Sequence, residues 1–174
     1  MDASDERDSV ASIDSTAAYT PTHTTEQDIS PLDELQSPRA SLASAPTPGR
    51  TYMIRHLGLG KTVSVKGGHL SLEHYDPHAG CYWNCVENRG WLGFSETVSG
   101  KYLGRNEKRA FSATVNAHSL WGSFVVTGHE NGGYYLRWLD GLTLLRWVGV
   151  GGDGQTLIYS ASSAKAAIWE FVEV

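Results

Sequence analysis

The feature that most constrains this chain is a repeat with a period of about 40 residues that occurs three times after residue 50. The three segments are residues 51–90, 91–133 and 134–174, with lengths of 40, 43 and 41 residues. Each begins with an aromatic strand start, passes a glycine turn and closes with two large apolar residues three apart, followed by valine. A fixed period of this size indicates an architecture built from repeated units.

Two sets of landmarks define the repeat. The glycine turns lead into short apolar pairs and read Gly60-Lys61-Thr62-Val63, Gly100-Lys101-Tyr102-Leu103 and Gly141-Leu142-Thr143-Leu144. The closing residues are Tyr82/Cys85/Val86, Trp121/Phe124/Val125 and Ile168/Phe171/Val172. Because matching positions of a repeat have matching environments, we expect the middle residue of each closing set to lie in the core.

Every segment has the pattern of β-structure, with short runs of Val, Leu, Thr and aromatic residues separated by Gly, Asn and Asp. A unit of this length has room for about four strands, so three units give about twelve. Closing three such units around an axis buries their apolar faces and removes most sheet edges. We therefore predict an all-β fold, a β-trefoil over residues 50–174. A β-propeller would need at least four blades, and an immunoglobulin-like sandwich would not explain the threefold period.

The first 50 residues differ in character from the repeats. They contain nine acidic and three basic residues, and Ser, Thr, Pro and Ala fill 26 of the 50 positions. Such a segment cannot bury enough apolar surface to offset its ordering entropy, so we predict a disordered acidic tail over residues 1–49. Four of its prolines follow Ser or Thr, which indicates either proline-directed phosphorylation or the chance frequency in such a composition. These pairs are Thr20-Pro21, Ser30-Pro31, Ser37-Pro38 and Thr47-Pro48.

Charge and hydropathy restrict the partners and the compartment. Residues 51–174 carry eleven basic and ten acidic residues with little clustering, which argues against nucleic acid and heparin-like ligands. The N-terminus lacks the basic start and apolar run of a secretory signal, and no stretch approaches the roughly 18 apolar residues of a membrane span. We therefore expect a cytoplasmic protein without membrane contact, in which Cys81 and Cys85 are reduced thiols.

The middle of the repeat region reads Trp91-Leu92-Gly93-Phe94-Ser95-Glu96-Thr97-Val98-Ser99-Gly100-Lys101-Tyr102-Leu103-Gly104. This segment resembles the repeat of fascin-like β-trefoil proteins, in which a strand precedes a G-K/R-Y-L-G/A turn about once every 40 residues. Two further segments resemble the same family, namely Trp83-Asn84-Cys85-Val86-Glu87 and Trp121-Gly122-Ser123-Phe124. The whole mixture is similar to fungal proteins with a single trefoil.

This resemblance implies a fold more than a function. Fascin-like proteins that bundle actin use several trefoils in tandem, and crosslinking needs at least two binding surfaces. A single trefoil would bind actin without bundling it unless it oligomerised, and no actin-contacting residue carries over to this sequence. Ricin-type lectins repeat a Gln-x-Trp motif, whereas Gln155 is followed by Thr156 and Leu157, so we do not expect that subfamily.

The sequence predicts neither an enzyme nor a cofactor site. It has no Gly-x-Ser-x-Gly elbow, no phosphate loop, no His-Glu-x-x-His and no evident carboxylate pair. One cluster with metal-binding residue types, His74, His78, Cys81 and Cys85, is an alternative zinc site. Its spacing is not that of a standard zinc knuckle, and the repeat makes Cys85 a core residue. We therefore expect no metal, and we expect residues 75–80 to form a hairpin tip.

The tryptophans are the main candidates for ligand contact, because aromatic faces with nearby polar groups bind sugars, although large aromatics also fill cores. The repeat assigns Trp91, Trp121 and Trp169 to the framework. Trp138 and Trp147 have no counterparts in the other segments, and each follows an arginine. We predict a ligand-binding patch with one exposed face on each indole, formed by Trp138, Trp147, Arg137 and Arg146.

Lys61 and Lys101 share one repeat position, which favours either a paired surface feature that belongs to the binding site or two solvated turn lysines. Three functional hypotheses remain. The first is a monomeric, non-catalytic intracellular module of fascin-like type that binds a protein partner, with actin as one candidate. The second is a cytosolic lectin that binds a glycan. The third is a trefoil protease inhibitor that acts through a projecting, rigid loop over residues 73–80.

Overall fold

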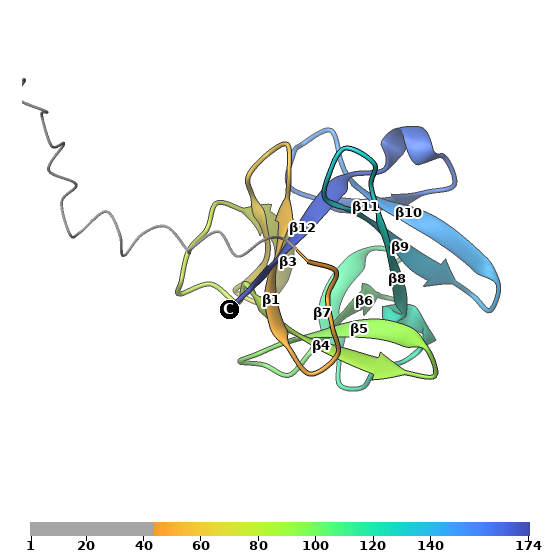
Figure 1. The fold of residues 1–174 in the computed structure, drawn as a ribbon. Helices are drawn as coiled ribbons and strands as arrows, with labels where there is room; N and C mark the ends of the chain where they lie inside the picture. The colour runs from red at the N-terminus through yellow and green to blue at the C-terminus, as the bar shows by residue number, and fades with distance from the viewer. Residues whose placement is uncertain (1–43) are drawn as a thin grey trace, which may run out of the picture. The chain divides into compact units, whose positions relative to one another are not determined.

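The computed structural model describes residues 44–174 (Figure 1), which contain twelve strands and two short 3-10 helices. The first four strands are β1 (Thr51–His56), β2 (Thr62–Lys66), β3 (His69–Glu73) and β4 (Tyr82–Asn88). The next group is β5 (Trp91–Glu96), β6 (Tyr102–Arg105), β7 (Phe111–Val115), η1 (Leu120–Gly122) and β8 (Phe124–Gly128). The last is β9 (Tyr134–Asp140), β10 (Leu144–Val150), β11 (Leu157–Ser160), η2 (Ser163–Lys165) and β12 (Ile168–Glu173).

Six of these strands form a closed antiparallel barrel. Around the ring, β1 pairs with β4, β4 with β5, β5 with β8, β8 with β9, β9 with β12, and β12 with β1. The last pair brings the end of the chain back beside the first strand (Figure 1). Because the ring is closed, none of the six strands is left as an open sheet edge.

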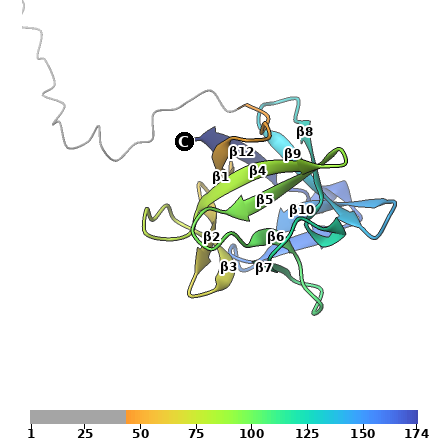
Figure 2. The same cartoon turned by 90° about the horizontal axis from the view of Figure 1, so that it is seen from below.

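The other six strands form three hairpins, β2–β3, β6–β7 and β10–β11. Figure 2 shows the β2–β3 and β6–β7 hairpins on the same side of barrel strands β4 and β5. We call β1–β4 lobe 1, β5–β8 lobe 2 and β9–β12 lobe 3, each with two barrel strands and one hairpin. This is the β-trefoil architecture, and the predicted fold class and number of strands are confirmed.

The core follows the threefold repeat. Cys85, Phe124 and Phe171, the middle residues of the three closing sets, are at most 1% exposed. Phe94 packs between two of them, with ring centroids 5.8 Å from Phe124 and 5.7 Å from Phe171. The expectation that these positions lie in the core is therefore confirmed.

The third glycine turn does not match the other two. Leu144, which the repeat pairs with Val63 and Leu103, is 53% exposed, whereas Val148 four residues later is fully buried. Strands β9 and β10 have seven residues each, longer than β1 and β2 or β5 and β6. The Gly141 turn, which connects β9 to β10, therefore lies farther from the barrel than its counterparts, and Leu144 falls outside the core.

Contacts with the barrel begin upstream of residue 50. The Gly49 amide donates to the Cys85 carbonyl at 2.8 Å, and the Cys85 amide donates to the Arg50 carbonyl at 2.8 Å. Apart from residues 44–49, the predicted tail lies outside the described residues. Neither 3-10 helix within residues 44–174 is long or apolar enough to cross a membrane.

Candidate ligand-binding cleft

Trp138, half of the predicted aromatic patch, belongs to the core. Its side chain is 1% exposed, and its indole N–H donates to the Trp121 carbonyl at 2.9 Å. Side chains alternate between the two faces of a strand, so Leu136 and Trp138 point inward while Tyr135 and Arg137 point outward. The predicted exposed face of Trp138 is therefore wrong.

The predicted basic residues are engaged in separate local contacts. Arg146 donates from Nε to Asp140 at 3.2 Å, and Asp140 also accepts from Arg105 at 3.2 Å. Lys61 and Lys101 follow equivalent glycine turns in lobes 1 and 2, as the repeat predicts. Lys61 donates to the Gly154 carbonyl at 3.1 Å, whereas Lys101 bonds the Asn116 side chain. The structure does not gather the six predicted residues into one site.

Trp147 and Arg137 do lie together, on the outer face of β9 and β10. The Arg137 guanidinium carbon lies 5.2 Å from the centroid of the Trp147 ring. Tyr135 packs edge-on against Trp147 at 5.0 Å, and His129 packs against Tyr135 at 5.0 Å. The Arg137 Nε is buried without a hydrogen-bond partner in the described part of the chain. We call these four residues the outer patch.

The alternative zinc site is wrong. Among residues 44–174, no three His, Cys, Asp or Glu side chains come close enough to hold a metal ion. Cys85 is fully buried in the barrel, and burial raises the pKa of its thiol to about 11. His74 and His78 are exposed.

The predicted hairpin tip at residues 75–80 is also absent, because β3 pairs with β2 and not with β4. The segment is instead the connection from β3 to β4. It is tied down by a hydrogen bond from the His78 amide to the Asp76 carboxylate at 2.9 Å and by a Tyr75–Tyr82 hydroxyl pair at 2.8 Å. Whether this loop acts as an inhibitor loop remains a prediction.

Trp121, which the repeat assigned to the framework, is the tryptophan that the fold exposes, at 47%. The reason lies one residue later. Trp83 and Trp169 precede Cys85 and Phe171 by two positions, and their indole N–H groups donate to the Val63 and Val148 carbonyls of their hairpins. In lobe 2 the same position is Gly122, whose backbone lies so near the Leu103 carbonyl that a Cβ would be 2.9 Å from it.

Backbone contacts hold the exposed tryptophan in a fixed place. A Cβ on Gly104 would lie 2.6 Å from the Trp121 carbonyl oxygen, so η1 rests directly on β6. The same carbonyl accepts the Trp138 indole N–H. Gly122, at the position where the other lobes carry tryptophan, lets η1 approach β6 and leaves the Trp121 side chain outside the core. This difference between the repeats was the sequence signal that could have predicted an exposed Trp121.

Trp121 borders a cleft of about 380 Å³ between the β6–β7 hairpin and η1. The other lining residues are Arg105, Asn106, Glu107, Lys108, Thr114 and Val115. We call this the Trp121 cleft. It is lined by one large aromatic side chain and by hairpin residues that carry hydroxyl, amide, carboxylate and ammonium groups. The arrangement offers an apolar platform with donors and acceptors around it.

Two residues that line the cleft, Arg105 and Asn106, are held by contacts with other side chains and with the backbone. Arg105 lies over the Trp138 and Tyr159 rings, at 5.3 Å and 5.5 Å, while it pairs with Asp140. The Asn106 side-chain oxygen accepts the Ala110 amide at 3.1 Å, which fixes the hairpin turn and leaves the Asn106 NH₂ group to donate elsewhere. Arg105 and the Asn106 turn are therefore held in place before a ligand binds.

His118 lies beneath the loop that carries Trp121. Its ring stacks on Tyr102 at 5.8 Å, and a Cβ on Gly93 would meet it at 2.8 Å. Both ring nitrogens are buried and form no hydrogen bond of standard geometry with any residue in 44–174. Burial lowers the pKa of His118, and the nearby Gly122 and Leu92 carbonyls only partly oppose this effect.

Known proteins resemble this chain in fold but not in sequence. No protein-family model and no curated protein matches the sequence. The ricin B-like lectin from Macrolepiota procera, solved with lactose, superposes with a TM-score of 0.60 at 14% identity, over 75% of this chain and 100% of the lectin. The Rhizoctonia solani agglutinin gives 0.59 at 13% identity, over 76% and 100%.

Larger proteins contain the same fold as one part. A GlcNAcα1-4Gal-releasing endo-β-galactosidase from Clostridium perfringens gives a TM-score of 0.60 at 13% identity, over 72% of this chain. The present chain spans only 32% of that enzyme, and 28% of a β-1,3-galactosidase of family GH43. At identities this low, the superpositions establish a shared β-trefoil fold and not a shared activity.

Proposed function

We propose that this protein is a non-catalytic carbohydrate-binding domain and that the Trp121 cleft holds the sugar. The observation that carries the proposal is the large exposed fraction of Trp121 at the edge of a cleft lined mainly by residues with polar side chains. Tryptophan is usually well buried, and an indole fixed at the surface by its backbone is available to a ligand.

A pyranose ring has two kinds of surface, an apolar face of C–H groups and a rim of hydroxyls. The indole of Trp121 offers a flat surface on which the C–H face is removed from water. Glu107 offers acceptors, Lys108 offers donors, and Thr114 offers both to the hydroxyls. With both charge signs present, the cleft fits a neutral sugar that needs both donors and acceptors.

The structural neighbours support the same class of ligand without identifying it. The Macrolepiota procera protein is a lectin that was solved with lactose, and the Rhizoctonia solani protein is an agglutinin. Because the likeness carries only the fold, the proposal rests on the residues of the Trp121 cleft itself.

The test is a glycan array probed with the full chain and with two variants, Trp121→Ala and Trp147→Ala. Loss of one indole contact removes roughly 1.5–3 kcal/mol of apolar burial, which is tenfold or more in affinity. We expect saturable binding of at least one glycan, lost in Trp121→Ala and retained in Trp147→Ala. Silence of the wild-type chain across the array, or equal binding by Trp121→Ala, would contradict the proposal.

A second candidate function is binding of a protein partner through the outer patch. Tyr, Trp and Arg dominate the energetics of protein interfaces, and the outer patch combines one of each on the outer face of β9 and β10. This candidate retains the fascin-like, intracellular hypothesis, with filamentous actin as its sharpest version.

Cosedimentation with filamentous actin tests that version. We expect the wild-type chain to pellet with filaments and Arg137→Ala to pellet less, with Trp121→Ala as the control that leaves pelleting unchanged. Failure of the wild-type chain to pellet at tens of micromolar would remove actin as a direct partner. An unaltered pellet with Arg137→Ala would remove the outer patch as its site.

A further inference from the structure

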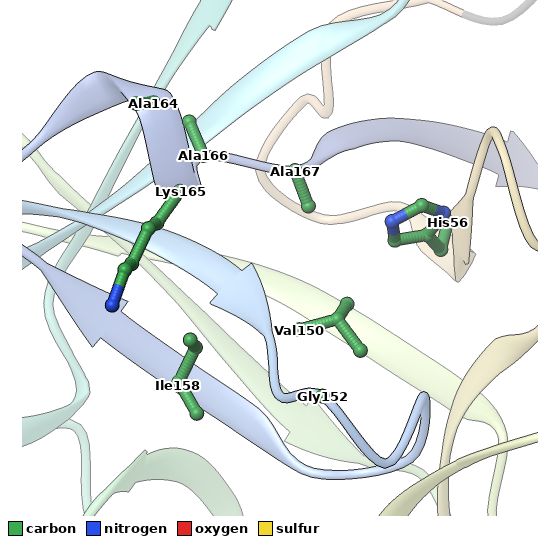
Figure 3. Close-up of a pocket in the computed structure, with 8 residues that line it drawn as sticks. All are labelled: His56, Val150, Gly152, Ile158, Ala164, Lys165, Ala166 and Ala167. Atoms are coloured by element: carbon green, nitrogen blue, oxygen red, sulfur yellow. The ribbon is translucent and has the colours of Figure 1, made fainter.

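Lobe 3 has a second cleft in the corresponding place, between its hairpin and its own 3-10 turn, but with different chemistry. It measures about 400 Å³ and is lined by His56, Val150, Gly152, Ile158 and residues 164–167 (Figure 3). We call it the lobe 3 cleft. Most of the side chains that line the Trp121 cleft are polar, whereas the side chains here are aliphatic except for His56 and Lys165.

The two polar side chains stand at opposite sides of the lobe 3 cleft. Figure 3 shows His56 on one side and the Lys165 side chain running toward Ile158 on the other. Lys165 is exposed, and no acceptor among the described residues pairs with its ammonium group. The Lys165 ammonium is therefore a positive charge beside aliphatic side chains and is available to bind a ligand.

His56 offers a donor of fixed position. Its Nδ1 accepts the Leu59 amide at 3.0 Å, so in the neutral ring the proton is on Nε2. The ring packs edge-on against Trp169 at 5.5 Å, and burial lowers the pKa of His56, which favours the neutral form. The imidazole therefore contributes an N–H donor that does not need to reorganise.

Asp153, which follows the lining residue Gly152, forms no ion pair with Lys165. The Asp153 carboxylate is occupied within its own turn, where it accepts the Gln155 amide at 3.0 Å and the Thr156 amide at 2.9 Å. The Thr156 hydroxyl also donates to it at 2.5 Å. The aliphatic walls keep their shape, because η2 lies directly on Gly149 and the Ala167 amide donates to the Val148 carbonyl at 3.1 Å.

We propose that the lobe 3 cleft binds a small organic anion, a monocarboxylate with a compact apolar body. The apolar body would lie between Val150 and Ile158, and the carboxylate would reach the Lys165 ammonium or the His56 Nε2–H. The volume is within the range of small-ligand sites, and the charge and the aliphatic walls together select this class over a sugar. This inference does not depend on carbohydrate binding at the Trp121 cleft.

The test uses benzoate as the probe and benzamide as its uncharged counterpart, titrated into the full chain while NMR follows the Val150 and Ile158 methyl groups and the His56 ring. We expect saturable shifts confined to the lobe 3 cleft and benzoate affinity roughly fivefold higher than that of benzamide, the size of one exposed ion pair. Lys165→Met should abolish this difference, and Lys108→Met, which removes a lysine from the Trp121 cleft, should preserve it.

Three results would overturn the proposal. The first is the absence of shifts in the lobe 3 cleft at tens of millimolar benzoate. The second is equal affinity for benzoate and benzamide in the wild-type chain. The third is an unchanged preference for benzoate in Lys165→Met. Since Lys165 is exposed, its substitution leaves the packed core intact, and a folded spectrum of that variant makes each result interpretable.

Discussion

The contact between η2 and β10 predicts a large effect from adding one methyl group. A Cβ on Gly149 would lie 2.0 Å from the Lys165 carbonyl oxygen and 3.2 Å from its carbonyl carbon. The backbone of Gly149 is not in the left-handed region, so the obstacle to Gly149→Ala is steric alone. Because the opposing atoms are backbone, the substitution must move η2 away from β10 or distort the strand.

The magnitude follows from two opposing terms. Overpacking of this kind costs roughly 1–3 kcal/mol, and stretching the Ala167–Val148 hydrogen bond adds roughly 1 kcal/mol. Replacing glycine by alanine also stabilises the protein by roughly 0.4–1 kcal/mol, because it reduces the conformational entropy of the unfolded chain. We expect a net loss of roughly 1–3 kcal/mol, which for a domain of this size lowers the Tm by roughly 3–10 °C.

Gly128→Ala is the matched control, because Gly128 also has an ordinary backbone conformation and a Cβ there would have nothing within 4 Å. Both variants remove one glycine from a strand, so the difference between them isolates the steric contact. The assay is denaturant unfolding of the full chain, supported by the Tm. If Gly149→Ala is as stable as Gly128→Ala, then η2 does not rest on β10 as described.

Two further predictions concern pH. Burial alone would raise the pKa of Glu96, but hydrogen bonds from Ser99, Val98 and Thr97 outweigh it and hold this pKa below its usual value. The ionised carboxylate therefore stabilises the fold above about pH 4.5, and this stabilisation is lost as the pH falls through the folded pKa. In urea unfolding, Glu96→Gln should lower the free energy of unfolding by roughly 1–2 kcal/mol at pH 7 and change it little at pH 3. His118 has a lowered pKa, so below about pH 6.5 protonation favours the unfolded chain and stability falls. His118→Gln should make the loss of stability between pH 7.5 and 5.5 smaller than in the wild-type chain, and an unchanged slope would show that His118 is not buried as described.

The sequence predicted the barrel because its core depends on a repeated pattern. Cys85, Phe124 and Phe171 occupy one position in three lobes, and each must be apolar wherever a closed barrel buries it. The same period, together with the glycine turns, was sufficient to predict twelve strands and the β-trefoil.

The site was harder to predict because it depends on departures from the repeat. Gly122 replaces the tryptophan of the other lobes, and this one change lets η1 approach β6 and leaves Trp121 outside. Trp138 was assigned to the surface because it lacked a counterpart, although its alternation with Arg137 on β9 makes it a core residue. Leu144 shows the opposite case, because β9 and β10 are longer than their counterparts and the turn between them places Leu144 outside the core.

The most direct test of carbohydrate binding at the Trp121 cleft follows the six tryptophan indole N–H signals by NMR while the best glycan from the array is titrated into the full chain. Trp83 and Trp169 donate to hairpin carbonyls in the core and serve as internal references. We expect the Trp121 signal to shift most and the Trp138 signal to shift next, because the Trp138 N–H donates to the Trp121 carbonyl. A shift confined to Trp147, or none at Trp121 under saturating glycan, would contradict it.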